Sequence, residues 1–303
     1  MRLKKSQQGC YIGHLAANAF AYADDIVLLS PSCKALKNFI LICENFASEY
    51  KLNFNPQKCK MLIFSRKKDN TNDINITIGG HKIEVVQSEK HLGHTIQTGH
   101  NIVNIDNIIR DIKIRTNVII NKFRYIAWQA KVKLFLSQCS SLYGSQFWNL
   151  DDPKIVDLCT AWRVCNHRLL DLDQQARSNL LHQIMDTFPI KDIIMSRILN
   201  FFTRGLNHES STISDFLKNT ITSHSSYMLT NINTILNKYN LNCHDLFSLN
   251  KRQIKKVIQT YNGEHDWRSS LVKDLLCMRD KQCDSVLDHT EIKQRLKDIS
   301  TQR

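Results

Sequence analysis

The sequence predicts an α+β fold, with antiparallel hairpins and one helix in the first hundred residues and helices in most of the remainder. Two observations carry this prediction. Short runs of β-favouring apolar residues, separated by turn residues, fill the N-terminal part, as is typical of strands and hairpins. From about residue 101 the apolar residues instead recur at three- and four-residue steps, which is the period of an amphipathic helix.

The first hundred residues alternate between predicted strands and turns. β-favouring runs predict strands at 11–12, 19–22, 26–29, 61–64 and 91–96, the last with a glycine inside it. Alternating apolar residues on both sides of Gly79-Gly80 predict a hairpin with arms at 74–78 and 83–86. Between these strands, apolar residues at helical spacing predict a helix over 33–50, with Ser32 as its N-cap.

The later residues divide into a basic helix and a longer helical region. Residues 101–135 carry seven Lys or Arg against two Asp on a helical pattern that runs over about 102–125. Such a surface can bind phosphates without reading sequence, or it can be the solvated face of a packed helix. We therefore expect three regions, 1–100, 101–150 and 151–303, of which the first is α/β and the others are α-helical.

The net charge is strongly positive, at +13 with a sequence pI near 9.3. This balance favours a polyanionic partner, either nucleic acid or an acidic membrane face, over a surface that is merely basic and soluble. The sequence has no run of about 20 apolar residues and no secretory signal, and its ten cysteines form no CxxC pair. We expect an intracellular protein, nuclear or cytoplasmic, with reduced thiols and no membrane partner.

The stretch FAYADDIVLL, residues 20–29, places Asp24 and Asp25 side by side among apolar residues. Neighbouring carboxylates repel, so the pair needs water or a cation nearby. Two strands only three residues apart put Ala23, Asp24 and Asp25 at the tip of a predicted hairpin. Carboxylates held there supply half of a site for Mg²⁺, whose remaining ligands are commonly waters and substrate phosphates. The alternative is a solvated turn without a role.

Six stretches of the sequence, in order and with agreeing spacing over residues 9–200, resemble the reverse transcriptases of non-LTR (LINE-type) retrotransposons. The YADD hairpin at 22–25, followed by IVLLSPS, resembles their catalytic hairpin. GCYIG (9–13), LNFNPQKCK (52–60) and HLGHTI (91–96) resemble the motifs around it, with Cys59 in place of a threonine and His91 in place of an aromatic residue. LYGSQFW (142–148) and Trp162-Arg163 resemble segments of the helical region after the thumb.

The resemblance implies an RNA-directed DNA polymerase that works on an RNA template, a DNA primer and a dNTP. It makes 1–100 a partial palm with the YADD hairpin and a primer-grip strand, 101–150 a helical thumb and 151–303 a helical C-terminal region. Asp24 and Asp25 are implied to hold Mg²⁺ for two-metal nucleotidyl transfer, and Lys58 to contact the triphosphate. The residues implied to contact nucleic acid are Tyr22, Leu92, Gly93, Arg110, Lys113, Arg115, Lys122 and Arg124.

The resemblance covers only the C-terminal part of such a polymerase. Only 23 residues precede Asp24, and none of them is Asp or Glu. The third carboxylate of the metal site, the fingers and the glycine-rich nucleotide-binding segment are therefore expected upstream of this sequence. We expect the chain by itself to bind Mg²⁺ weakly and to lack polymerase activity. Two further interpretations stay open, a non-catalytic basic nucleic-acid-binding protein and a functionless retroelement relic. The oligomeric state is left open.

Overall fold

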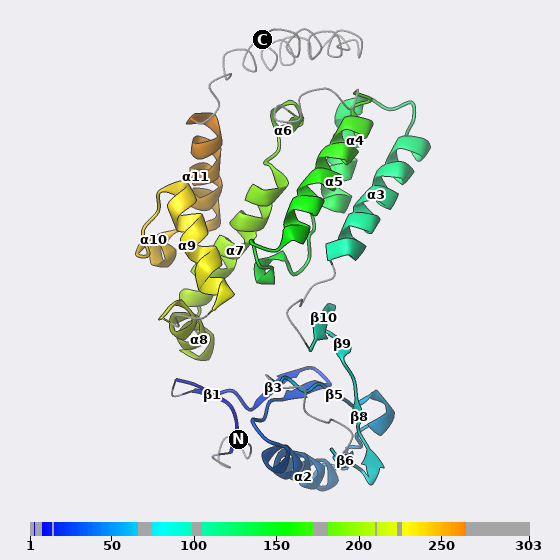
Figure 1. Cartoon of the computed structure of the whole chain (residues 1–303), viewed down its shortest axis with the longest axis vertical. Helices are drawn as coiled ribbons and strands as arrows, with labels where there is room; N and C mark the ends of the chain where they lie inside the picture. Colours follow the sequence, from blue (N-terminus) through cyan, green and yellow to red (C-terminus); the bar gives the residue numbers. More distant parts are fainter. Residues whose placement is uncertain are drawn as a thin grey trace. The chain divides into compact units, whose positions relative to one another are not determined.

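The computed structural model describes residues 3, 8–13, 15–65, 74–98, 105–172, 181–209, 211–222 and 226–264. The chain divides into two compact units, Met1–Val103 with Glu209–Ser223 and Asn104–His208 with His224–Arg303. In the described residues the strands belong to the first unit, and the second unit is helical (Figure 1). The α+β fold class predicted from the sequence is confirmed.

In its described ranges the first unit combines short strand pairs with helices α2 and α8 and a 3₁₀ turn. Its elements are β1 (Tyr11–Ile12), β2 (Leu15–Ala16), β3 (Ala19–Tyr22), β4 (Asp25–Leu28), α2 (Cys33–Glu49), η1 (Pro56–Lys58), β5 (Lys60–Met61), β6 (Thr77–Ile78), β7 (His81–Lys82), β8 (Glu84–Val85), β9 (Ser88–His91), β10 (His94–Gln97) and α8 (Ser211–Thr222). Four strand pairs are antiparallel, and β5 pairs with β8 in parallel.

Helix α2 contributes apolar side chains to a buried cluster of the first unit. The Ser32 hydroxyl accepts a hydrogen bond from the Ala35 N–H at 3.2 Å, so the predicted N-cap is confirmed. The inner face of the helix meets a buried cluster that includes Ile40, Ile76 and Ile78. This cluster and the partly buried side chains packed against it come from residues 28–85.

The β3–β4 hairpin closes through the shortest regular connection, a two-residue turn. Tyr22 is paired with Asp25, which leaves Ala23 and Asp24 as the turn residues. The predicted three-residue tip is therefore one residue too long, because Asp25 already belongs to β4. Ala23 has a φ of 53°, in the left-handed region that costs an L-residue about 1–2 kcal/mol. A positive φ at the first turn residue only is the pattern of a type II′ hairpin turn.

The predicted single strand at 91–96 is wrong, because the chain reverses inside it. Strands β9 and β10 form an antiparallel hairpin in which His91 pairs with His94. Leu92 and Gly93 form the turn, with φ values of 48° and 81°. Two consecutive left-handed residues make the turn that fits the twist of a two-residue hairpin. Gly93 therefore belongs to a turn at which the chain reverses direction, and not to a strand whose backbone closely approaches another.

The predicted hairpin around Gly79-Gly80 is present but shorter than expected. Thr77 pairs with Lys82 and Ile78 with His81, across two glycines with φ values of 56° and 77°. Residues 84 and 85 do not continue the second arm, which is a correction to the prediction. They form β8, which pairs in parallel with β5. Similarly, the strand expected at 61–64 is limited to β5, at Lys60–Met61.

The second unit is built from helices that pack around α5 and α7. Its elements are α3 (Ile105–Lys122), α4 (Trp128–Cys139), η3 (Ser145–Phe147), α5 (Pro153–Leu169), α6 (Leu181–Ile184), α7 (Ile190–Leu206), α9 (Tyr227–Tyr239), α10 (Asp245–Ser248) and α11 (Lys251–Glu264). Helix α3 packs on α4 and α5, and α7 packs on η3, α9, α10 and α11. The predicted helix over 102–125 is thus described from residue 105 to residue 122, and residues 101–104 lie outside the described ranges.

Buried polar side chains tie distant parts of this unit together. Asn231, which is 2% exposed, donates to the Trp148 carbonyl at 2.7 Å and accepts from the Leu150 N–H at 2.9 Å. Asp192, which is 1% exposed, forms an ion pair with Lys238 and accepts hydrogen bonds from the Tyr239 hydroxyl and the Asn262 amide, each at 3.0 Å. Such satisfied groups fix the register of α7, α9 and α11.

The helices of the described residues include none that is both long and apolar enough to cross a membrane.

Replacing Ala23 with glycine should stabilise the β3–β4 hairpin by about 0.5–1 kcal/mol. Glycine relieves the left-handed strain at this position, and that gain exceeds the entropy that glycine loses on folding. Amide hydrogen exchange of the peptide that covers residues 19–28 should become slower. Ala21→Gly is the matched control, because Ala21 lies in β3 opposite Ile26 and has no positive φ. It should accelerate exchange, and a slower exchange in both variants would contradict the strain at Ala23.

Replacing Asn231 with leucine should destabilise the second unit by about 2–4 kcal/mol. Leucine has a similar size but leaves the Trp148 carbonyl and the Leu150 N–H buried without partners. Urea denaturation followed by tryptophan fluorescence measures this loss, because Trp128, Trp148 and Trp162 all lie in the described residues of the second unit. Asn233→Leu, on the exposed side of the same helix, should change the free energy of unfolding by less than about 0.5 kcal/mol.

Candidate active site and nucleic-acid interface

The two adjacent aspartates lie at an exposed hairpin end, as the sequence predicts. Asp24 is the second residue of the β3–β4 turn, and Asp25 begins β4. Both are exposed, and neither forms an ion pair with another residue of the described ranges. The pair therefore avoids the cost of burying two like charges by staying in water, and its oxygens stay accessible to a cation.

The backbone of the turn limits how Asp24 and Asp25 can coordinate a cation. Asp24 and Asp25 are neighbours on a turn whose backbone is fixed by the pairing of Tyr22 with Asp25. Oxygen ligands from two carboxylates fit Mg²⁺, which commonly keeps several waters. Among the described residues, no group of three or more His, Cys, Asp and Glu side chains is placed to hold a metal ion. The pair can thus supply part of a divalent-cation site.

The hairpin that carries the aspartates exposes apolar side chains. Phe20 is 51% exposed, Tyr22 is 68% exposed and Ile26 is 48% exposed. The hairpin is a two-stranded sheet, and all four residues of β3 are exposed. Isolated two-stranded ribbons are marginally stable in water, and exposed aromatic side chains on such a ribbon suit contact with a partner or ligand. Tyr22 is thus accessible for the nucleic-acid contact that the resemblance implies.

Lys58 is distinguished from its basic neighbour Lys60 by its surroundings. Lys58 ends η1, which begins after Asn55, whose side chain accepts from the Gln57 N–H at 3.1 Å. The Lys58 side chain is exposed and has no ion pair within the described residues. Lys60 instead pairs with Glu84, and the hydrogen bond to that carboxylate raises the pKa of Lys60. Of these two lysines, Lys58 is the one whose ammonium is available for a phosphate.

The predicted primer-grip residues lie at the tip of a hairpin. Leu92 and Gly93 form the β9–β10 turn, and Leu92 is 41% exposed. Leucine in the left-handed region is uncommon, since its side chain crowds the following carbonyl. Strained backbone of this kind is concentrated at functional sites, although it also occurs in ordinary turns. The Leu92 side chain is therefore partly accessible, on a turn whose backbone is fixed by the pairing of His91 with His94.

The five predicted phosphate-binding residues of the thumb do not form one continuous face. The buried side of α3 carries Ile105, Ile112, Thr116 and Ile119. At about 100° per residue, Arg110 falls nearly opposite that buried stripe and Lys113 on one flank of it. Arg115 and Lys122 fall on the other flank. Arg115 also donates to the Gln138 carbonyl at the end of α4. All five side chains are exposed, and they are spread around the accessible surface of α3 and its following turn.

The turn after α3 contains an exposed residue that the sequence interpretation missed. Tyr125 is 95% exposed and lies one residue after Arg124, the last of the predicted thumb contacts. An aromatic residue between basic residues is a recognised signal for nucleic-acid binding. That signal is present in the sequence, where Arg124 directly precedes Tyr125.

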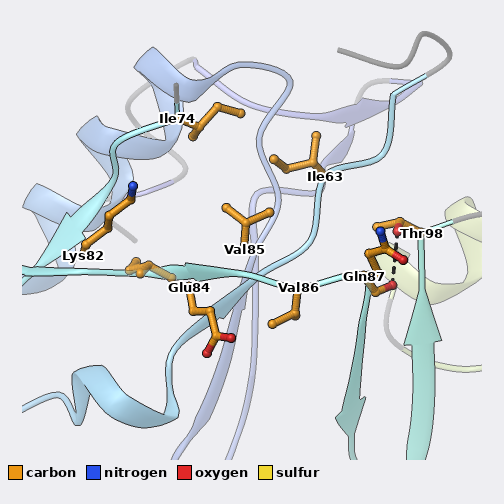
Figure 2. Close-up of a pocket in the computed structure, with 9 residues that line it drawn as sticks. Ile63, Ile74, Lys82, Glu84, Val85, Val86, Gln87 and Thr98 are labelled. Carbon is orange, nitrogen blue, oxygen red and sulfur yellow. Dashed lines mark hydrogen bonds between the residues drawn. The ribbon is translucent and has the colours of Figure 1, made fainter. Parts of the chain in front are cut away.

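A pocket of about 730 Å³ lies in the first unit, between the chain segments around Ile63, Ile74 and β8. Figure 2 shows Ile63, Ile74 and Val85 directed towards a common apolar space, whereas the Glu84 carboxylate points away from it. None of the predicted catalytic or nucleic-acid-binding residues lines this pocket. The pocket is therefore separate in its residues from the paired aspartates.

Comparison with known proteins assigns the segment that holds the paired aspartates. Residues 3–96 match the family model described as reverse transcriptase (RNA-dependent DNA polymerase). No curated protein and no solved structure matches the chain. The matched residues include Tyr22, Asp24, Asp25, Lys58 and the Leu92–Gly93 turn, whereas α3 and the later helices lie outside the match. The N-terminal third of the chain, with the candidate catalytic site, is therefore similar to reverse transcriptases.

Proposed function

We propose that this chain is part of an RNA-directed DNA polymerase of a LINE-type retrotransposon. The observation that carries the proposal is the exposed Asp24–Asp25 pair on a tight hairpin within the segment that matches the reverse transcriptase family. The other motif residues lie on exposed turns of the same segment, with Lys58 at the end of η1 and Leu92 in the β9–β10 turn. The substrates of such an enzyme are an RNA template, a DNA primer and a dNTP.

The donor chemistry of the paired aspartates fits magnesium. Asp24 and Asp25 would hold Mg²⁺ through carboxylate oxygens, with waters and nucleotide phosphates as further ligands. When bound, Mg²⁺ supplies charge stabilisation to the oxygens that attack and leave during nucleotidyl transfer. Without such a cation the two carboxylates would repel the phosphates of primer and nucleotide. Among the described residues no ion pair occupies these carboxylates, so their oxygens are accessible for this role.

The remaining predicted residues act on the substrates directly. The Lys58 ammonium is proposed to contact the triphosphate, where its charge offsets the negative charge of the nucleotide. Leu92 and Gly93 are proposed to hold the primer end, because a rigid turn positions a terminus with little loss of entropy. The basic residues of α3 and its following turn are proposed to contact the backbone of the template–primer. Arg115 is the weakest of these candidates, since its guanidinium already binds the Gln138 carbonyl.

A second interpretation keeps the nucleic-acid binding and omits the catalysis. It is favoured by one observation, the lack of a third His, Cys, Asp or Glu near the aspartates in the described residues. Polymerases of the proposed class use a further carboxylate from another strand, which would have to join Asp24 and Asp25 for full activity. The two interpretations agree on the partner but differ on the role of the Asp pair.

Asparagine at both aspartate positions should separate the two roles. Asp24→Asn with Asp25→Asn should tighten binding of an RNA–DNA duplex in the absence of divalent cations, by about fivefold, because two charges that repel phosphate are removed. The same change should abolish binding of Mn²⁺, measured by electron paramagnetic resonance as a substitute for Mg²⁺. Asp151→Asn with Asp186→Asn removes the same charge from exposed positions of the other unit and should leave Mn²⁺ binding unchanged. Equal Mn²⁺ binding by all three proteins would contradict a metal site at the Asp pair.

Purified chain should not extend an oligo(dT) primer on a poly(rA) template with dTTP and Mg²⁺. The described residues supply two carboxylates to the proposed site, and the third is missing from them. Incorporation of labelled dTTP measures the outcome. Extension that disappears in Asp24→Asn would show the chain to be active and the pair catalytic. Extension that persists in Asp24→Asn would exclude the pair from catalysis and overturn the proposed site.

A further inference from the structure

The α3–α4 turn, residues 122–126, presents apolar side chains to solvent at the end of a basic helix. Tyr125 is 95% exposed, and Phe123 and Ile126 beside it are each 36% exposed. A buried tyrosine ring stabilises a protein through its large apolar area. The exposed Tyr125 ring makes no such contribution to the fold of this chain. Exposed apolar groups gathered in one short segment indicate a surface that contacts something else.

The backbone of the turn is ordered although its tip is exposed. The Phe123 N–H donates to the Ile119 carbonyl at 3.0 Å, and the Ile126 N–H donates to the Phe123 carbonyl at 3.4 Å. The Lys131 ammonium donates to the Arg124 carbonyl at 3.0 Å and so ties the turn to α4. A side chain held on a fixed backbone loses little conformational entropy when a ligand binds. The turn therefore holds Tyr125 ready for contact.

The charge around the turn selects an anionic ligand. Residues 112–150 contain no Asp or Glu but contain Lys113, Arg115, Lys122, Arg124, Lys131 and Lys133. Lys122 and Arg124, which alternate with the apolar residues of the turn, are both exposed. A surface that pairs an accessible aromatic ring with flanking cations complements a strand of stacked bases and phosphates.

We propose that the α3–α4 turn binds single-stranded nucleic acid, with Tyr125 stacked on an unpaired base and Lys122 and Arg124 on the neighbouring phosphates. The choice of nucleic acid as partner rests on the proposed polymerase function. The preference for a single strand rests on the ring itself, because the faces of paired bases inside a duplex are covered by their neighbours. The ligand of this turn is thus distinct from the duplex backbone that basic residues alone would bind.

Fluorescence anisotropy with a labelled 20-nucleotide dT strand and a matched DNA duplex tests the proposal on the full chain. Tyr125→Ala should weaken binding of the single strand about tenfold and leave duplex binding within twofold. Tyr125→Phe should bind the single strand within twofold of the unaltered chain, since phenylalanine keeps the stacking face. Lys122→Ala with Arg124→Ala should lower the slope of log K against log salt by about 1.4, because two phosphate contacts are lost.

The matched control is Tyr143→Ala, which removes a tyrosine that is 62% exposed from the same acid-free stretch and should not change binding. An effect of Tyr125→Ala below twofold on the single strand would overturn the proposal, as would an equal loss for strand and duplex. If Tyr125→Ala loses binding to phosphatidylserine vesicles but keeps its binding of the single strand, the turn contacts a membrane and the proposal is overturned. Failure of the unaltered chain to bind any nucleic acid would overturn both this inference and the proposed function. Single-strand binding that is unchanged in Tyr125→Ala would overturn this inference alone.

Discussion

The two-residue turn at Ala23–Asp24 is the constraint on which the candidate active site depends. Because Tyr22 pairs with Asp25, the connection has only two residues, Ala23 and Asp24. Ala23 adopts a positive φ, and Asp24 and Asp25 are the next two residues of the chain. Alanine lacks the freedom of glycine at such a position, and the strain of about 1–2 kcal/mol must be offset by the rest of the fold. A looser turn would leave the orientation of the two neighbouring carboxylates less fixed. The short connection thus fixes the backbone that carries two repelling groups.

In the first unit the buried apolar residues and the candidate site residues lie on different elements. Buried side chains of α2, β5 and β6 pack together around Ile40, Ile76 and Ile78, whereas β3 is exposed along its whole length. This division has a simple physical basis, because the hydrophobic effect rewards burial of the isoleucines and penalises burial of the carboxylates. Lys58 also stays on the exposed side, while Lys60 is held by Glu84. The groups left in water are those that can meet nucleotide and primer.

In the second unit, packing decides which basic side chains remain available. Arg115 donates a hydrogen bond to the Gln138 carbonyl. Arg197 donates to the carbonyls of Ser140 and Leu142, and its burial lowers the pKa of its guanidinium. These arginines close the end of α4 and are committed to the fold. Lys122 and Arg124 point instead from an ordered turn that also presents Tyr125. Net charge alone, at +13, does not distinguish the two groups.

The sequence alone determined the features that depend on near neighbours. The β-favouring apolar runs on both sides of the Asp pair predicted the β3–β4 hairpin, helical spacing predicted α2, and the hydroxyl of Ser32 predicted its cap. The α+β class and the similarity to reverse transcriptases were also readable, because the matched motifs lie within 3–96. Each of these signals rests on residues a few positions apart, where period and turn chemistry restrict the backbone strongly.

Only the tertiary structure decided the features that depend on distant partners. Glu84–Val85 leaves the predicted hairpin to pair in parallel with Lys60–Met61, and the run at 91–96 reverses at Leu92–Gly93. Asn231 bridges the backbone of Trp148 and Leu150 across 83 and 81 residues of sequence. No local pattern marks such contacts, because the free energy that selects them comes from burial and hydrogen bonds between segments that meet only in the folded chain.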